Sequence, residues 1–287
     1  MKGTVALHMF MMVLRELEHS LDLCAADGND DDDDYSIEDD PLRALDKAVA
    51  YYMGSLEGNV ANNSTNSHML YYIAESICAD FNTCESGESR VNRDLFLDFN
   101  LLQDIYEDND DCSLARKVVQ GGLAHMLYIP LIQTTLFYAF KQGVEDQTSP
   151  ANTAKINAEG AMFTAAILPM LHSCDADDAE IVYQNMKLDE TSSTDFFAVK
   201  QALERNYGCM GLTCFDIGGV FIEGEYFAGA EPCTDEPEES SSADTDIAPV
   251  VSKYELLGSY APSTDVADYV SVRFCNQTQL WSDLFIP

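Results

Sequence analysis

Basic residues are scarce in this sequence. Its 287 residues include 15 lysines and arginines against 50 aspartates and glutamates, which gives a formal net charge of −35. Nucleic-acid-binding proteins neutralise phosphates with clustered Lys and Arg side chains, and this chain has no such cluster. The same charge disfavours binding to an anionic lipid surface. The negative electrostatic potential of the chain favours a cationic partner or a metal ion over these anionic ligands.

Long apolar runs are also absent. No stretch approaches the roughly 20 uncharged apolar residues that span a bilayer, so we expect no transmembrane segment in this chain. The start, MKGTVALHMFMMVLRELEHSLDLC, imitates a signal peptide because an apolar run follows Lys2. It has no small-x-small cleavage site, and apolar residues recur past the charges at Leu14, Leu17 and Leu21. This spacing predicts an amphipathic helix.

Local catalytic motifs are missing as well. The sequence has no G-x-S-x-G, P-loop, H-E-x-x-H or dinucleotide-binding glycine pattern, and its histidines lack zinc-finger spacing. Asp27, Asn29, Asp31 and Glu38 match EF-hand ligand spacing, but Asp32 replaces the required glycine. Because a run of aspartates matches such patterns by chance, we interpret this segment as a flexible insertion. We expect a protein that is not an enzyme.

Cysteines and N-glycosylation sequons point to an oxidising compartment. The chain has nine cysteines, and the pairs Cys78/Cys84 and Cys209/Cys214 flank short turns that could close small disulfide loops. The sequons begin at Asn62, Asn63 and Asn276. Together these features favour the extracellular or periplasmic space, or the outer face of the plasma membrane. The alternative is a cytosolic protein with reduced, buried cysteines.

Helical periodicity dominates the chain, and it predicts an all-α, multi-helix bundle with long acidic loops and a mixed C-terminal tail. The predicted helices span residues 1–24, 41–54, 67–81, 90–106, 113–141, 151–172, 177–186 and 195–207. In the longest of them, we expect Gly121 and Gly122 to allow close packing and Pro130 to produce a kink. The Gly-rich segment after Cys214 is predicted to form turns.

Composition divides the chain into three parts. Residues 1–230 form the helical unit, 231–248 an acidic linker rich in serine and proline, and 249–287 the mixed tail.

Three acids fall on helix faces that should be apolar. Asp46 lies on the core face of helix 41–54, Glu159 on that of helix 151–172, and Glu16 in an apolar row of the first helix. An unpaired carboxylate at such a position costs several kcal/mol, so each must be protonated, paired or bound to a metal ion. Taken singly, each also has an ordinary explanation, such as an ion pair between Asp46 and Lys47.

Further oxygens follow Asp46 along the chain. Tyr51, Tyr52 and Glu57 lie at the end of the 41–54 helix and add phenol and carboxylate groups. Asp, Glu and Tyr oxygens suit a hard cation, and ferric iron in particular favours phenolate. As a group, these residues therefore indicate a candidate iron site.

Four stretches resemble one known family. They are ALDKAVAYYMGSLEGN, SLARKVVQGGLAHMLYIPLIQTTLFYAFK, AEGAMFTAAILPMLHSCDADDAEIVYQNM and DFFAVKQALERNYGCMGLTCFDIGG, which span most of residues 42–219. In these segments the chain resembles the secreted Fe-assimilating (high-CO2-inducible periplasmic) proteins of algae, which are related to the phytotransferrins. The tail segment YAPSTDVADY resembles the opening of a family unit. This implies tandem repeats, in which residues 1–230 lack the N-terminal part of one unit and 249–287 start a second.

The resemblance implies capture of ferric iron for uptake, with (bi)carbonate as a companion anion and without catalysis. Carried over residue by residue, the implied iron ligands are Glu16, Asp46, Tyr52, Glu57 and Glu159. Arg15 or Arg205 would hold the carbonate. The chain departs from the family at Arg15 and at Tyr269, each of which stands where the family has a histidine.

An uptake receptor, a reductase or a permease at the cell surface would be the implied protein partner. Two other functions stay open. One is an acidic cell-surface interaction module without a working metal site, and the other, with less support, is a helical metallohydrolase.

Overall fold

The computed structural model confirms the all-α, multi-helix fold. It describes residues 2–26, 40–54, 69–107, 111–144, 150–188 and 194–234. Several predictions lie outside these ranges: the EF-hand-like segment, the ligand Glu57, Tyr269, the three sequons, most of the acidic linker and the whole tail from residue 249.

The helices match the predicted positions closely. They are α1 (Lys2–Ala26), α2 (Pro41–Met53), α3 (Leu70–Ile77), α4 (Arg90–Glu107), α5 (Cys112–Val118), α6 (Ala124–Met126), α7 (Ile129–Gly143), α8 (Pro150–Cys174), α9 (Ala176–Met186), α10 (Phe196–Glu204) and α11 (Cys214–Ile217). A single 3-10 turn, η1 (Ala79–Phe81), follows α3, and a π-helical segment, η2 (Val119–Leu123), joins α5 to α6.

Local capping explains where α2 begins and ends. The Asp40 carboxylate accepts a hydrogen bond from the Leu42 backbone N–H, 2.9 Å away, and Pro41 occupies the first turn. Proline suits that position because its missing N–H would have no partner within the helix there. Gly54 ends the helix with φ of +79°, a conformation that favours glycine. These caps fix the first and last residues of the helix that carries Asp46.

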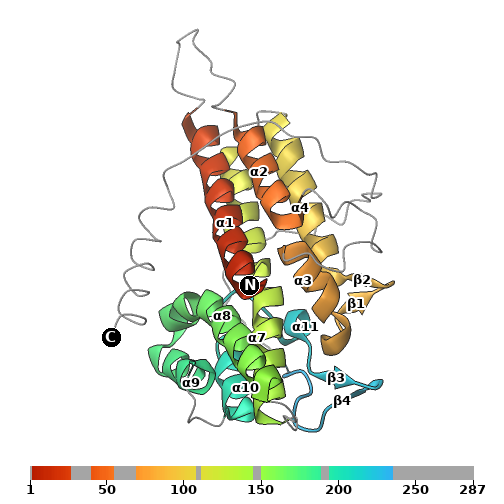
Figure 1. Ribbon diagram of the computed structural model, residues 1–287. Helices are drawn as coiled ribbons and strands as arrows, with labels where there is room; N and C mark the ends of the chain where they lie inside the picture. Colours follow the sequence, from red (N-terminus) through yellow and green to blue (C-terminus); the bar gives the residue numbers. More distant parts are fainter. Residues whose placement is uncertain are drawn as a thin grey trace, which may run out of the picture.

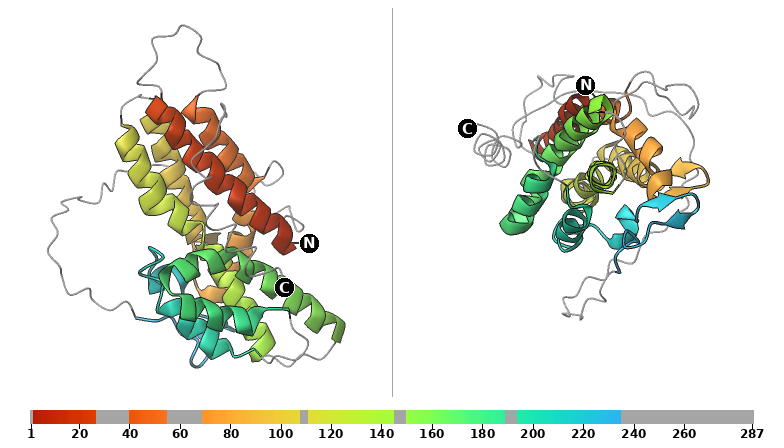
Figure 2. Two further views of the ribbon diagram at one scale, coloured as in Figure 1. Left: turned by 90° about the vertical axis from the view of Figure 1, so that its left-hand side faces the viewer. Right: turned by 60° about the horizontal axis from the view of Figure 1, so that its bottom comes forward.

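The helices pack in two groups around one continuous apolar core. In Figure 1, α1, α2, α4 and α5 stand side by side in the upper half, whereas α7, α8, α9 and α10 pack together in the lower half. Figure 2 shows the same two groups from two other directions. The two groups meet where the N-terminal end of α1 lies against α8, with Gly3 touching Met162.

One long helical segment, Cys112–Gly143, passes from the upper group into the lower one (Figure 1). By length and composition it is the one helix in the described part of the chain that could cross a membrane, but 72% of its apolar window is buried inside the fold. A turn at Leu127–Tyr128 interrupts it, and Pro130 lies in the first turn of α7, a position that tolerates its missing N–H. Gly122 packs closely as predicted, whereas Gly121 has open space around its Cα.

Two short β-hairpins were not predicted. Strand β1 (Cys84–Glu85) pairs antiparallel with β2 (Glu88–Ser89), and β3 (Phe221–Ile222) pairs with β4 (Glu225–Tyr226). Each hairpin turns over a two-residue loop that ends in glycine, Ser86-Gly87 or Glu223-Gly224, and all four residues have positive φ. This is the type I′ turn that matches the twist of two paired strands. The Gly-rich segment after Cys214 therefore contains a hairpin and the short helix α11 as well as turns.

Within the described ranges, four disulfides cross-link the fold. They join Cys24 to Cys112, Cys78 to Cys84, Cys174 to Cys209, and Cys214 to Cys233. The predicted small loop between Cys78 and Cys84 is present.

The predicted loop between Cys209 and Cys214 is wrong. Cys209 follows α10 and meets the C-terminal end of α8, whereas Cys214 is the first residue of α11 and meets the segment after β4. The ninth cysteine, Cys275, lies outside the described residues.

Candidate functional site

Two buried polar residues lie on one face of α1. Glu16 and His19 are three residues apart, a spacing that puts two side chains next to each other on a helix. Only 4% of each residue is exposed. Arg15, one residue earlier, is exposed instead. The buried surface of α1 therefore carries a carboxyl group and an imidazole among mostly apolar side chains.

Asp46 adds a second carboxyl group from α2. It is 3% exposed, and α2 packs along α1 (Figure 1). The next residue, Lys47, is half-buried, and its positive charge acts on both Glu16 and His19. The turn of α2 that carries Lys47 therefore lies near the turn of α1 that carries Glu16 and His19. Glu16, His19 and Asp46 are called the α1–α2 polar cluster below.

Burial and nearby cations set the protonation of this cluster. Burial raises the pKa of Glu16, and the charges of Lys47 and Arg15 oppose that shift only in part. Burial, together with Arg15 and Lys47, lowers the pKa of His19 to about 3, so its ring is neutral at physiological pH. A neutral imidazole and a carboxylate are the forms in which histidine and glutamate bind metal ions. Glu16 Oε2 has no hydrogen-bond partner in the described part of the chain.

Tyr52 lies apart from this cluster. Six residues at about 100° each turn it about 120° around the helix from Asp46. Its fully buried hydroxyl donates a hydrogen bond to Asn92 Oδ1 on α4. Burial and the charge of Glu75 raise the pKa of Tyr52 well above that of an ordinary tyrosine. The residue is therefore a structural phenol in this arrangement.

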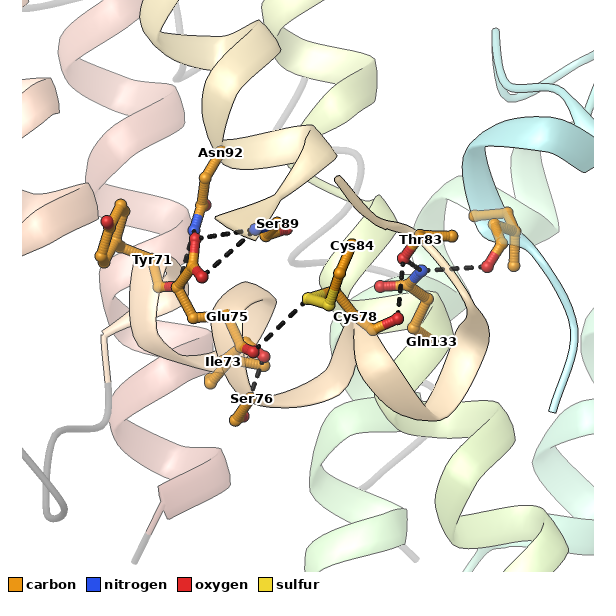
Figure 3. Close-up of a disulfide and its surroundings, with 11 residues drawn as sticks. Tyr71, Ile73, Glu75, Ser76, Cys78, Thr83, Cys84, Ser89, Asn92 and Gln133 are labelled. Atoms are coloured by element: carbon orange, nitrogen blue, oxygen red, sulfur yellow. Dashed lines mark hydrogen bonds between the residues drawn. A yellow bond between two sulfur atoms is a disulfide. The ribbon is translucent and has the colours of Figure 1, made fainter. Parts of the chain in front are cut away.

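The hydrogen bonds continue from Asn92 to the Cys78–Cys84 disulfide region, as Figure 3 shows. Asn92 Nδ2 donates to the Tyr71 carbonyl at 3.0 Å and to Glu75 Oε1. Both carboxylate oxygens of Glu75 accept from the Ser89 backbone N–H, at 3.1 and 3.2 Å. This network joins α2, α3, α4 and β2. The Tyr52 hydroxyl and the Glu75 carboxylate are therefore both used in hydrogen bonds that stabilise the fold.

Glu159 is held elsewhere by a tyrosine that the sequence did not single out. Tyr138 on α7 donates to Glu159 Oε2 at 2.6 Å, and the pKa of Tyr138 is raised by burial and by this acid. The Glu159 backbone lies near Gly3, at the start of α1. Because the helix rises about 1.5 Å per residue, Glu16 is about 20 Å farther along α1. Ligands of one ion lie about 2 Å from it, so the arrangement does not unite Glu159 with Glu16.

The side chain of Arg205, the second predicted anion-binding residue, forms an ion pair within the fold. Its guanidinium forms an ion pair with Asp178 at the start of α9, and its Nε donates to Asp178 Oδ2 at 3.1 Å. The buried Asp178 carboxylate also accepts from Asn206 Nδ2 at 2.8 Å, and these partners lower the pKa of Asp178. We therefore assign Arg205 to a structural ion pair rather than to an anion site. Of the two predicted anion-binding arginines, Arg15 alone lies beside the cluster.

The predicted ligands thus divide among three places. Glu16 on α1 and Asp46 on α2 are buried on two helices that pack together, Tyr52 is hydrogen-bonded to α4, and Glu159 is hydrogen-bonded to α7. Within the described ranges, no three His, Cys, Asp or Glu side chains form a group that could hold a metal ion. Glu57 lies outside those ranges.

His19 is the residue that sequence reasoning missed. Its signal was local, because Glu16-Leu17-Glu18-His19 is a Glu-x-x-His sequence, the spacing by which bundle helices present two ligands to iron or manganese. A second buried acid, Asp46, lies on α2, which packs against α1. The cluster therefore offers two carboxyl groups and one imidazole from two packed helices.

Comparisons with protein-family models, with curated proteins and with solved structures found no match to the chain.

Proposed function

We propose that this protein binds ferric iron outside the cytoplasm for uptake, without catalysis, at the α1–α2 polar cluster. The observation that carries the proposal is the buried Glu16 carboxyl group, which has an oxygen without a hydrogen-bond partner in the described structure. Buried carboxyl groups are costly unless they gain a partner, and a bound cation would supply one. Asp46 and the neutral ring of His19 would add the second and third donors.

The chemistry of the cluster suits a small, highly charged cation. Two carboxylates carry charge −2, and a ferric ion would neutralise both while accepting the imidazole nitrogen. Binding requires the three side chains to turn toward one ion, since they do not form such a group in the described structure. The positively charged side chains of Arg15 and Lys47, which lie near the cluster, would then be available to bind a companion (bi)carbonate. This departs from the expected ligand set because it replaces the phenol of Tyr52 with His19.

The disulfides and the charge of the chain support the compartment. Four disulfides are compatible with an extracellular or periplasmic location, where they persist. The net charge of −35 would attract cations toward the surface. In this role, bound iron would pass to a receptor, reductase or permease at the cell surface.

Metal analysis of purified, chelator-treated protein tests the proposal. The protein is mixed with ferric nitrilotriacetate at several bicarbonate concentrations, separated by gel filtration and analysed for iron. We expect stoichiometric iron in the wild type and strong loss in Glu16→Gln, His19→Gln and Asp46→Asn. Glu159→Gln is the matched control and should bind normally. No bound iron at any bicarbonate concentration would contradict the proposal.

The visible spectrum of the loaded protein identifies the ligands. The α1–α2 cluster contains no phenolate, so bound iron should lack a tyrosinate charge-transfer band. If that band is present and Tyr52→Phe removes it, iron sits instead at the originally expected ligand set. If Tyr138→Phe removes it, iron sits beside Glu159 on α7 and α8.

The alternative is an acidic interaction module without a metal site. It is favoured by the lack of a three-residue ligand group among the described side chains. Under this alternative, the variants of Glu16 and Asp46 leave the metal content of the protein unchanged. The same iron measurements therefore separate the two functions.

A further inference from the structure

Two exposed leucines lie on the neighbouring helices α4 and α5. Leu97 on α4 is 36% exposed, and Leu114 on α5 is 40% exposed. One helical turn after each of them comes a partly buried apolar residue, Leu101 on α4 and Val118 on α5. Each helix therefore carries a row of apolar side chains that the fold does not fully bury.

A contact between Asp98 and Gly122 brings the two rows together. Asp98 follows Leu97 on α4, and Gly122 lies one turn after Val118, in the π-helical segment η2. A Cβ at position 122 would lie 3.0 Å from Asp98 Oδ2, and α4 packs against both α5 and η2. Eight residues separate Gly122 from Leu114, which is about 12 Å along the helix axis. The rows therefore border one strip about 12 Å long.

The strip has an open position at Gly121. This glycine is exposed, and a Cβ there would meet no atom within 4 Å. Its φ is not in the left-handed region, so the backbone does not require glycine. Glycine destabilises a helix interior relative to alanine, and π-helical turns occur frequently at functional sites. Position 121 therefore leaves room at the surface for a side chain from outside the fold.

Asp98 is an acid without a partner beside this open position. Within the described ranges it forms no hydrogen bond or ion pair, and no basic nitrogen lies within 4.0 Å of its carboxylate. Arg93, one turn before it on α4, is paired with Glu85 and Asp94. Burial and the charge of Asp94 raise the pKa of Asp98 to about 6. A cation from outside the fold would relieve both effects.

The chemistry of the strip selects among the molecules that could cover it. A lysine or arginine side chain can lay its aliphatic stem along leucines and place its charged end on a carboxylate. A symmetric contact with a second copy would instead bring Asp98 near an identical acid, in a chain whose net charge is −35. An anionic membrane is repelled by the same charge. The length of the strip matches about two turns of a helix laid along it.

We propose that the α4–α5 face binds a basic helical segment of a partner protein. The face consists of Leu97, Asp98 and Leu101 on α4 and of Leu114, Val118 and Gly121 on α5 and η2. Apolar side chains of the partner pack on the two leucine rows, and one lysine or arginine passes over Gly121 to pair with Asp98. None of these residues belongs to the α1–α2 polar cluster, so this proposal does not depend on iron binding.

A titration followed by nuclear magnetic resonance tests the face. The probe is an acetylated and amidated helical peptide of leucine and lysine, with the leucines on one face, added to the ¹⁵N-labelled full chain. The amide signals of residues 97–101 and 114–122 should shift more than those of the rest of the chain. The same peptide with glutamine in place of lysine should bind at least tenfold more weakly, because it cannot pair with Asp98.

Two variants with matched controls locate the contact. Asp98→Asn should weaken peptide binding about tenfold, the worth of a charge-assisted hydrogen bond, whereas Glu180→Gln removes one exposed charge on α9 and should leave binding nearly unchanged. Gly121→Gln fills the open position without changing the charge, and it should weaken binding to a similar extent. Gly208→Gln alters an exposed glycine with equally open surroundings and should not. Circular dichroism should show that all four variants fold.

Several outcomes would overturn the proposal. They are a lack of peptide binding, amide shifts spread evenly over the acidic surface, or equal weakening by Asp98→Asn and Glu180→Gln, which would mean that net charge alone attracts the peptide. Light scattering provides one more. If the wild type is a dimer and Leu114→Ser makes it a monomer, a second copy covers the face instead of a basic partner.

Discussion

Replacing Glu16 with methionine should stabilise the metal-free protein. The glutamate is 4% exposed, and its Oε2 has no hydrogen-bond partner in the described structure. An unsatisfied buried acceptor costs about 1–3 kcal/mol, and methionine fills a similar volume without that group. We expect the free energy of unfolding at pH 7 to rise by about 1–3 kcal/mol. For a domain of this size, each kcal/mol corresponds to about 2–4 °C in Tm.

The pH dependence of this gain follows from the direction of the pKa shift. Burial raises the pKa of Glu16, so the native state binds this proton more readily than the unfolded state. The contribution of Glu16 to the free energy of unfolding of the wild type is therefore most favourable at acidic pH, and it falls as the pH rises through the raised pKa. The advantage of Glu16→Met should accordingly be largest at pH 7 and shrink toward pH 4.

Thermal and urea unfolding followed by circular dichroism, on chelator-treated protein with intact disulfides, provides the measurement. Glu180→Met is the matched control, because Glu180 is an exposed helical glutamate and its removal reports only the general effect of lowering the net charge. If Glu16→Met is less stable than wild type at pH 7, the attraction of Lys47 and Arg15 outweighs the burial cost. The reasoning about an uncompensated carboxyl group would then be refuted.

Three further substitutions test the surrounding assignments. Tyr52→Phe should lower the free energy of unfolding by about 1 kcal/mol and leave iron binding unchanged; loss of iron would restore Tyr52 as a ligand. Burial and Asp94 raise the pKa of Asp98 to about 6, so stability should fall as the pH rises through about 6. Asp98→Asn should remove that step in unfolding measurements, and an unchanged pH profile would contradict it. Arg205→Ala strips the buried Asp178 of its ion pair and should cost about 1–3 kcal/mol, while bicarbonate-dependent iron binding persists.

The helices could be predicted because their signals are local. Apolar spacing located α1 and α4, and α2 begins at Pro41 as predicted. The π-helical segment η2 could not be predicted in the same way, because one widened turn changes the hydrogen-bond pattern without changing the apolar period. The hairpins were missed although both loops end in glycine, because their strands have only two residues and leave no alternation to detect.

The candidate site was predicted in part. Periodicity identified Glu16 and Asp46 as acids on core faces, and both are buried. It could not show which faces meet, and so it grouped Glu159 with residues about 20 Å away. His19 was not singled out from the sequence, and its burial next to Glu16 becomes informative only with the second helix in place.

The Cys24–Cys112 bond has a consequence for proteolysis. It ties the end of α1 to the start of α5 across 88 residues, so a peptide bond cut anywhere between them leaves both fragments covalently attached. A nicked chain would migrate as one species on a non-reducing gel and as two after reduction. As long as this bond stays oxidised, a severed molecule would keep α1 attached to α5 instead of shedding its N-terminal piece.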